Sequence, residues 1–220
     1  MLGSKRMGQV LANIERRCKY AVKATSSIRV KGGQAEAIMA DALCDAKVPI
    51  ENATDKHTPG ADIFPTFRSR VIDGISAKSG KKKKHRGVEN TLALSGYRLG
   101  RFHKDLDATV TWIQENKPSA FLCLANPTPA GKKAKVFADF YLYSVFLFEA
   151  HLLDYGTPEM WTASENGKRY FLETPYMKAE IRHSMSSQLW TYIDINALGI
   201  QPMHSFAVPN KKSLTLRRPT

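Results

Sequence analysis

An acid, a hydroxyl and an amine lie close together on two short segments that both have the composition of β-strands. Asp62 opens the first predicted strand, residues 61–67, and Ser76 and Lys78 lie at the end of the second, residues 70–77. Side chains alternate between the two faces of a strand, so Ser76 and Lys78 point the same way. If the two strands pair, the three side chains converge on one point. Such a set suits a divalent metal ion and a water molecule that attacks a phosphate.

These residues also have ordinary structural interpretations, which we keep as an alternative. An aspartate that opens a strand is often the cap of a turn. A Ser-x-Lys sequence at a strand end is often a solvated edge. Under this alternative the Asp62 and Lys78 pair has no catalytic role.

The rest of the chain mixes predicted helices and strands without regular alternation, which indicates an α/β fold with a mixed central β-sheet flanked by helices. A length of 220 residues is typical of one domain. The basic end of the chain, residues 209–220, is expected to be a loosely ordered tail. The predicted helices span residues 8–24, 34–46, 106–114 and 145–153, with 91–102 as a further candidate. The remaining predicted strands span residues 120–125, 136–143, 168–171, 177–181 and 191–195, and the predicted loops span residues 51–60, 79–87 and 126–133.

The charge of the chain points to a polyanionic partner. The formal net charge is +13 and the isoelectric point is near 9.7. Such an excess favours binding to nucleic acid, because neutralised phosphates release their bound counterions.

The cysteines and the apolar segments indicate a cytoplasmic protein. Cys18, Cys44 and Cys123 form no CxxC or Cys/His cluster, which argues against a zinc site. Free thiols are typical of a reducing cytoplasm. The N-terminus has no apolar signal core, and charged residues interrupt the most apolar window, residues 136–153. We therefore expect an intracellular protein with no membrane segment.

Two basic patches are candidate DNA contacts. The first follows Lys78 within a few residues and suits a loop that lies along a DNA groove or backbone. The second begins at residue 97. A flexible solvated loop and a surface helix end are the alternative interpretations. The predicted DNA-binding residues are Lys81, Lys82, Lys83, Lys84, Arg86, Arg98 and Arg101.

Base-reading groups are not fixed by the sequence. Residues 126–135 and 180–188 carry amides, hydroxyls and cationic groups of the kind that contact base edges. The three tryptophans, Trp112, Trp161 and Trp190, are expected in the core.

The candidate residues occur in an order that resembles a known family. Glu36 lies on a predicted helix, Asp62 follows a loop, and residues 76–78 end a strand. A lysine-rich segment and residues 91–97, TLALSGY, come next. This layout resembles the PD-(D/E)xK nuclease superfamily, which includes most type II restriction endonucleases, and is closest to the EcoRV-like subgroup. The resemblance covers residues 34–102 and implies a restriction-endonuclease-like fold.

The main departure from the family pattern is Ser76, which occupies the position of an Asp or Glu. A serine hydroxyl is a weak, neutral metal ligand, so a second carboxylate has to come from elsewhere. Glu36 is the first candidate and Glu89 the second. Asp73 is the third, because it lies on the opposite face of an ideal strand from Lys78.

The resemblance implies a role for each candidate catalytic residue. Asp62 bridges Mg²⁺ and the scissile phosphate, and Glu36 or Glu89 supplies the second anionic ligand. Ser76 offers a hydroxyl or a water-mediated contact. Lys78 orients the attacking water and stabilises the developing charge. In-line attack then leaves a 5′-phosphate and a 3′-hydroxyl.

We therefore predict a Mg²⁺-dependent type II restriction endonuclease in which residues 1–220 form one catalytic and DNA-binding domain. It hydrolyses double-stranded DNA at a specific, palindromic site, and a homodimer matches that symmetry. One alternative is a non-catalytic nucleic-acid-binding protein. The other is a structure-specific repair or phage nuclease of the same superfamily.

Overall fold

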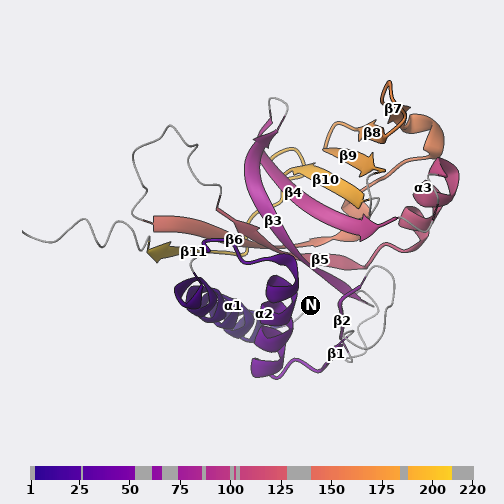
Figure 1. The fold of residues 1–220 in the computed structure, drawn as a ribbon. Helices are drawn as coiled ribbons and strands as arrows, with labels where there is room; N and C mark the ends of the chain where they lie inside the picture. Colours follow the sequence, from indigo (N-terminus) through magenta and orange to yellow (C-terminus); the bar gives the residue numbers. More distant parts are fainter. Residues whose placement is uncertain are drawn as a thin grey trace, which may run out of the picture.

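Two long helices cover one face of a β-sheet in the computed structural model (Figure 1). The structure describes residues 3–25, 27–52, 61–65, 74–85, 88–99, 102, 105–127, 140–183 and 188–209. Helices α1 (Ser4–Ala24) and α2 (Gly32–Asp45) confirm the first two predicted helices and begin a few residues before them. Their apolar side chains recur at helical spacing and are buried. The buried set includes Val10, Leu11, Ile14 and Cys18 in α1 and Ala35, Ile38, Met39 and Ala42 in α2.

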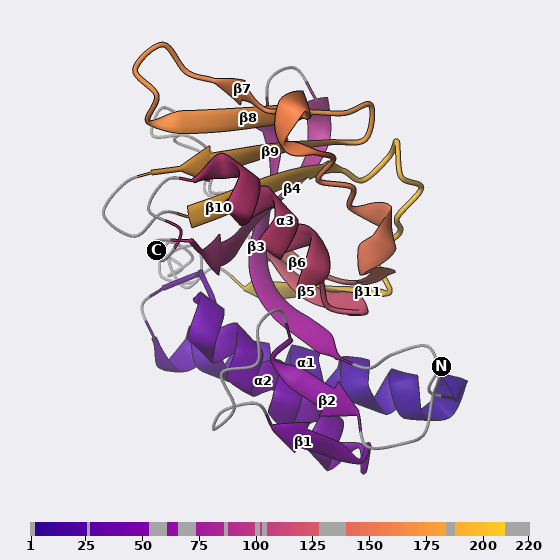
Figure 2. The same cartoon turned by 90° about the vertical axis from the view of Figure 1, so that its right-hand side faces the viewer.

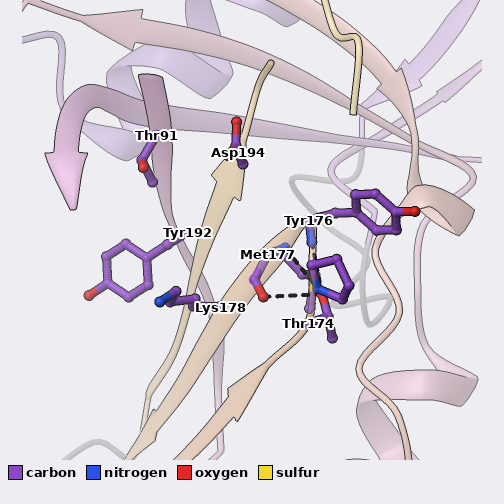
Figure 3. Close-up of a pocket in the computed structure, with 8 residues that line it drawn as sticks. Thr91, Thr174, Tyr176, Met177, Lys178, Tyr192 and Asp194 are labelled. Atoms are coloured by element: carbon purple, nitrogen blue, oxygen red, sulfur yellow. Dashed lines mark hydrogen bonds between the residues drawn. The ribbon is translucent and has the colours of Figure 1, made fainter. Parts of the chain in front are cut away.

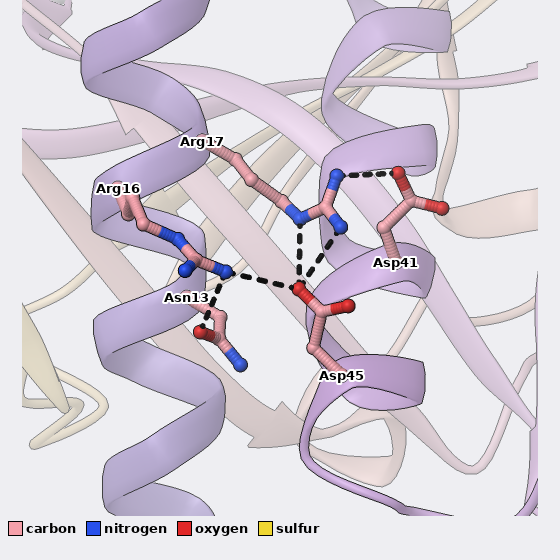
Figure 4. A network of polar contacts seen from close by, with 5 residues as sticks. All are labelled: Asn13, Arg16, Arg17, Asp41 and Asp45. Carbon is pink, nitrogen blue, oxygen red and sulfur yellow. Dashed lines mark hydrogen bonds and ion pairs between the residues drawn. The ribbon is translucent and has the colours of Figure 1, made fainter.

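Ion pairs join α1 and α2 on their exposed side (Figure 4). Arg17 Nη1 lies 2.8 Å from Asp41 Oδ2, and Arg17 Nη2 lies 2.9 Å from Asp45 Oδ2. Arg16 Nη2 lies 3.2 Å from the same oxygen of Asp45. Exposed ion pairs contribute about 0–1 kcal/mol each, so the buried apolar faces supply most of the stability of this helix pair. The ion pairs lie along the seam between α1 and α2, and α2 carries Glu36.

The described strands form one 11-stranded sheet. The order of strands along the main path is β11-β6-β5-β3-β4-β10-β9-β8-β7, and β2 joins β1 to β3. Strands β3 and β5 are parallel, and the other pairs are antiparallel. The sheet is therefore mixed, which confirms the predicted α/β class. The strands are β1 (Ile50–Asn52), β2 (Ile63–Pro65), β3 (Ile75–His85), β4 (Val88–Arg98), β5 (Ala120–Asn126), β6 (Phe140–Glu149), β7 (Thr162–Ala163), β8 (Arg169–Glu173), β9 (Met177–Arg182), β10 (Gln188–Asp194) and β11 (His204–Pro209).

The core lies on both faces of this sheet, and β5 shows why. All seven residues of β5 are buried, as predicted for a strand covered on both sides. Leu122 and Leu124 pack into the cluster that α1 and α2 cover, and Phe121 and Cys123 pack into the cluster on the other face. Helix α3 (Leu106–Glu115) covers that second cluster (Figure 2) and confirms the helix predicted at residues 106–114. No helix in the described part of the chain is both long enough and apolar enough to span a bilayer.

The lysine-rich segment is a strand, so the loop predicted at residues 79–87 is wrong. Strand β3 continues to His85, and Lys81, Lys82 and Lys83 pair with β4. The candidate helix at residues 91–102 is wrong as well, because residues up to Arg98 belong to β4. Both segments owe their conformation to pairing with each other, which local composition does not reveal. Residues 66–73, where the strand before Lys78 was expected to start, lie outside the described residues.

The helix predicted at residues 145–153 is also wrong. Strand β6 runs from Phe140 to Glu149, and only a short 3-10 turn, η3 (Ala150–Leu152), follows it. β6 pairs with β5 on one side and with β11 on the other. A strand that is buried on both faces has no period-two pattern, so its apolar run reads like a buried helix. The edge strand β11 was missed, and residues 210–220 of the predicted tail lie outside the described residues.

Candidate active site

The backbone of Asp62 is held at the start of β3. Its N–H donates to the carbonyl oxygen of Ile75 at 2.9 Å, and the next residue, Ile63, pairs with Ile75 in the sheet. The ladder between β3 and β4 begins only at Gly80. The carboxylate of Asp62 therefore lies along the edge of β3 between the contacts with β2 and β4.

One oxygen of Asp62 accepts three hydrogen bonds from β3. The Ser76 hydroxyl donates to Oδ2 at 3.0 Å, the Ala77 N–H at 2.8 Å and the Lys78 ammonium at 3.0 Å. Ala77 is fully buried among the residues packed against α1 and α2, whereas Ser76 and Lys78 project away from that core. The predicted alternation along the strand, and the predicted convergence of Asp62, Ser76 and Lys78, are confirmed.

The cluster is half-buried, which strengthens its electrostatics. The Lys78 and Asp62 side chains are 17% and 31% exposed, and Ser76 is 1% exposed. Charges that are shielded from water interact more strongly than charges on an open surface. The ammonium and carboxylate are thus a positioned pair, and the Ser76 hydroxyl adds a neutral donor to the same oxygen.

Glu36 brings a second carboxylate to this cluster from α2. Burial raises the pKa of Glu36, the negative charge of Asp62 raises it further, and the ammonium of Lys78 lowers it. Both charges of the pair therefore act on Glu36. Two carboxylates that repel each other through a half-buried space form an environment that favours a cation.

Glu89, the alternative source of the second carboxylate, is separated from Lys78 by the register of the sheet. Val88 pairs with His85, whereas Lys78 lies two residues before Gly80, which pairs with Leu94. At about 3.3 Å per residue, the backbone of Glu89 lies about 20 Å along the hairpin from that of Lys78. Asp73 lies outside the described residues.

Asp62 and Glu36 are the two acids that the structure brings to the cluster in the described residues. No three side chains of His, Cys, Asp or Glu among them form a group that could hold a metal ion. The site accordingly offers Asp62, Glu36 and the Ser76 hydroxyl as oxygen ligands.

The predicted DNA-binding residues that the structure describes belong to the hairpin of β3 and β4. Lys81 is half-buried and Lys82 is exposed. The backbones of Lys83 and Lys84 continue β3, and Arg98 ends β4. Arg86 and Arg101 lie outside the described residues.

A basic cleft next to the cluster was missed at the sequence level. It has a volume of about 400 Å³ and lies between the start of α2 and the strands β3, β4, β9 and β10. Trp190 lines it and is only half-buried, so the prediction of a core position for this tryptophan is wrong. Nothing in the local sequence signals that Arg29 and Lys31, which precede α2, lie opposite Arg182 in β9. The cleft is lined by Arg29, Val30, Lys31, Gly32, Ser79, Gly80, Lys81, Ala93, Ser95, Asn126, Arg182, Trp190 and Tyr192.

A second hollow near the other end of β10 is too small for a substrate (Figure 3). Its volume is about 30 Å³, which is room for ordered water only. Thr174, Lys178 and Asp194 are among its lining residues, and none of the predicted catalytic residues is.

Comparisons of the chain with family models, curated proteins and solved structures return no significant match. Any functional conclusion therefore depends on the chemistry of the Asp62 cluster and of the cleft beside it.

Proposed function

We propose that this protein is a Mg²⁺-dependent endonuclease of the PD-(D/E)xK type that hydrolyses phosphodiester bonds in double-stranded DNA. The observation that carries the proposal is the convergence of Ser76, the Ala77 N–H and Lys78 on Asp62, with the ammonium at 3.0 Å. The order of elements adds support. A helix with Glu36, a strand after Asp62 and a Ser-x-Lys strand follow one another as in the layout of the superfamily.

The chemistry of the residues fits Mg²⁺. This ion is bound by oxygen ligands and commonly by one or two carboxylates, while waters and phosphate oxygens complete its coordination. Asp62 and Glu36 are two such carboxylates, and the charge of Asp62 acts on the pKa of Glu36. Bound Mg²⁺ would polarise the scissile phosphate and stabilise its developing charge.

Lys78 has a separate task in this proposal. Its ammonium is held by Asp62 at the edge of β3, where it can orient an attacking water molecule and stabilise negative charge on the phosphate. The Ser76 hydroxyl keeps the Asp62 carboxylate in place. In-line attack by the water breaks the bond to the 3′ oxygen and leaves a 5′-phosphate and a 3′-hydroxyl.

The finer assignment is a cytoplasmic type II restriction endonuclease that cuts a palindromic site as a homodimer. A two-fold dimer places one Asp62 cluster on each strand of a palindrome. Cys18, Cys44 and Cys123 are free thiols, which suits the reducing cytoplasm.

The first prediction concerns cleavage by two variants of the cluster. Asp62→Asn removes the charge that binds the cation, and Lys78→Ala removes the donor that stabilises the transition state. We expect each to lower the rate of plasmid cleavage in Mg²⁺ by about 10²-fold or more, because one transition-state donor such as Lys78 is worth about that factor and loss of the Asp62 charge removes the cation that stabilises the phosphate. Binding of the same DNA in a chelator should persist.

Matched controls are Asp107→Asn and Lys168→Ala, which make the same changes at exposed positions outside the cluster. Both should cut like the wild type. Discrete bands from a digest of mixed-sequence DNA support a restriction enzyme, and cutting of flaps or junctions alone supports the structure-specific nuclease. If Asp62→Asn cuts at the wild-type rate, the proposed site is wrong.

A non-catalytic DNA-binding protein is the second candidate. Ser76 supplies no charge, and Lys78 already neutralises the carboxylate of Asp62, which is how a purely structural pair would look. This candidate predicts that the wild type binds DNA and leaves it uncut in Mg²⁺ and in chelator alike.

A further inference from the structure

The segment that leads into α2 is fixed against β3 by one buried amide. The Val30 N–H donates to Asn126 Oδ1 at 2.8 Å, and Asn126 Nδ2 donates to the Val30 oxygen at 3.1 Å. The same Nδ2 donates to Ser79 Oγ at 2.7 Å, and the Ser79 hydroxyl donates to the Val30 oxygen at 2.7 Å. Val30 and Asn126 are 1% and 3% exposed. The cleft beside α2 is therefore a preorganised feature of the fold.

Cations of that cleft come from three separate elements. Arg29 and Lys31 flank the fixed Val30, Lys81 belongs to β3 and Arg182 to β9. No acidic side chain is among the described residues that line the cleft. Glu180 lies behind Arg182, with its carboxylate 8% exposed, and accepts a hydrogen bond from the guanidinium at 2.7 Å. The cleft thus presents a positive surface suited to phosphate.

One wall of the cleft is planar. The guanidinium of Arg182 lies over the ring of Trp190, 5.3 Å from its centroid. The Tyr192 hydroxyl accepts from the same guanidinium at 3.3 Å. Proteins that bind single-stranded nucleic acid stack bases on guanidinium and aromatic planes. Such stacking tolerates any base sequence.

The volume of the cleft limits the size of the ligand that it can hold. About 400 Å³ is in the range of pockets that hold one small ligand. A B-form duplex, whose major groove alone is about 12 Å wide, is too large for it. Phosphate-binding cations and a stacking wall within this volume match one nucleotide of an unpaired strand.

The cleft and the candidate catalytic cluster are neighbours on the same two elements. Ser79 and Gly80 follow Lys78 directly in β3. Gly32 precedes Glu36 by about one turn of α2, which is a rise of about 6 Å. None of Asp62, Ser76, Lys78 and Glu36 lines the cleft, so the link between cleft and cluster runs along the backbones of β3 and α2.

We propose that the cleft binds one nucleotide of a single DNA strand, with its phosphate on Arg29 and Lys31 and its base against the Arg182 and Trp190 wall. This inference rests on the proposed function, because it supplies the substrate strand to the same cluster. It makes unpaired DNA the preferred ligand of the cleft, and it predicts that the enzyme holds an unpaired or extruded nucleotide beside the bond that it cuts.

Binding is measured by fluorescence anisotropy with a labelled oligothymidylate in chelator, so that no cleavage interferes. The double variant Arg29→Ala/Lys31→Ala should bind about tenfold more weakly. Trp190→Ala should bind about 5- to 150-fold more weakly, because stacking of one base is worth about 1–3 kcal/mol. Trp190→Phe keeps an aromatic plane and should stay within about threefold of the wild type.

The matched control is Lys5→Ala/Arg6→Ala, which removes two exposed charges near the start of α1. It should weaken binding about twofold or less. A fully paired duplex should compete poorly for the cleft, and its binding should depend little on Trp190. Circular dichroism checks that each variant is folded.

The outcomes separate this inference from the proposed function. If Arg29→Ala/Lys31→Ala and Trp190→Ala both bind oligothymidylate as tightly as the control does, the cleft is not the binding site. This holds even if the wild type cuts DNA. If binding depends on the cleft but the wild type cuts nothing in Mg²⁺, the inference holds and the nuclease proposal fails. Tighter binding of oligouridylate would overturn the assignment to DNA.

Discussion

Asp62 is the residue on which the candidate site is centred, and its neighbours were predictable because a strand alternates strictly. Ser76 and Lys78 had to share a face once β3 formed, and their contacts with Asp62 at 3.0 Å confirm it. The position of Glu36 was less predictable from the sequence. It comes from a helix, and only the tertiary packing of α2 against β3 brings it near. The strand register that separates Glu89 from the cluster could not be predicted from the sequence either, because β4 itself was not predicted.

The second prediction uses the charge on Glu36 as a probe of the cation site. The pKa of Glu36 is raised above its usual 4.5 by burial and by Asp62. Because the pKa is higher in the folded state, the protonated side chain of Glu36 favours folding. This contribution is complete below pH 4.5 and is lost as the pH rises through the folded-state pKa. At neutral pH in chelator the charged Glu36 therefore opposes folding. Glu36→Gln should raise the melting temperature there, and Mg²⁺ should raise it for the wild type more than for the variant.

Glu115→Gln is the control for this measurement, because Glu115 is exposed at the end of α3. It should change neither the melting temperature in chelator nor the response to Mg²⁺. Equal responses of the wild type and Glu36→Gln to Mg²⁺ would remove Glu36 from the ligand set.

At the scale of elements, the errors of prediction share one cause. β4, β6 and the end of β3 are strands because they pair with other strands, some next in the chain and some distant, and their local sequences carry other signals. Four consecutive lysines suggest a solvated loop, yet Lys81–Lys83 pair with residues 91–93 of β4. Helices α1 and α3 were predictable because their buried faces follow the local 3.6-residue period.

The third prediction concerns Gly80 of β3, where β4 leaves no room for a side chain. A Cβ on Gly80 would lie 2.7 Å from Leu94 Cδ2 and 3.0 Å from the carbonyl oxygen of Ala93. Leu94 is buried, so it cannot move aside without disturbing the core. We expect Gly80→Ala to lower the free energy of unfolding by about 1–3 kcal/mol, as overpacking does.

The same substitution at Gly8 is the comparison. Gly8 lies in the interior of α1, and no heavy atom lies within 4 Å of a Cβ built there. Gly8→Ala should therefore raise the free energy of unfolding by about 0.5–1 kcal/mol. Urea denaturation of both variants gives the two changes. A neutral Gly80→Ala would mean that β3 and β4 tolerate a wider separation than the structure indicates.

At the scale of the whole molecule, the strand order brings cationic side chains from distant parts of the chain to one cleft. The helices α1 and α2 bury one face of β3, β5, β6 and β11, while the strands beyond β3 line the basic cleft. The net charge of +13 was visible in the sequence. Its placement was not, because Arg29, Lys31 and Arg182 come together only through the sheet order β3-β4-β10-β9.

The last prediction concerns the salt dependence of binding, because its slope is proportional to the number of phosphates that the protein neutralises. For a single strand, the logarithm of the affinity falls with the logarithm of the salt concentration by about 0.7 per neutralised phosphate. If Arg29 and Lys31 together neutralise the phosphate of the one bound nucleotide, Arg29→Ala/Lys31→Ala should reduce that slope by about 0.7. Trp190→Ala should weaken binding and leave the slope unchanged, because stacking releases no counterions. Titrations of oligothymidylate at four or more salt concentrations give the slopes, and an unchanged slope for the double variant would show that the two cations do not contact phosphate.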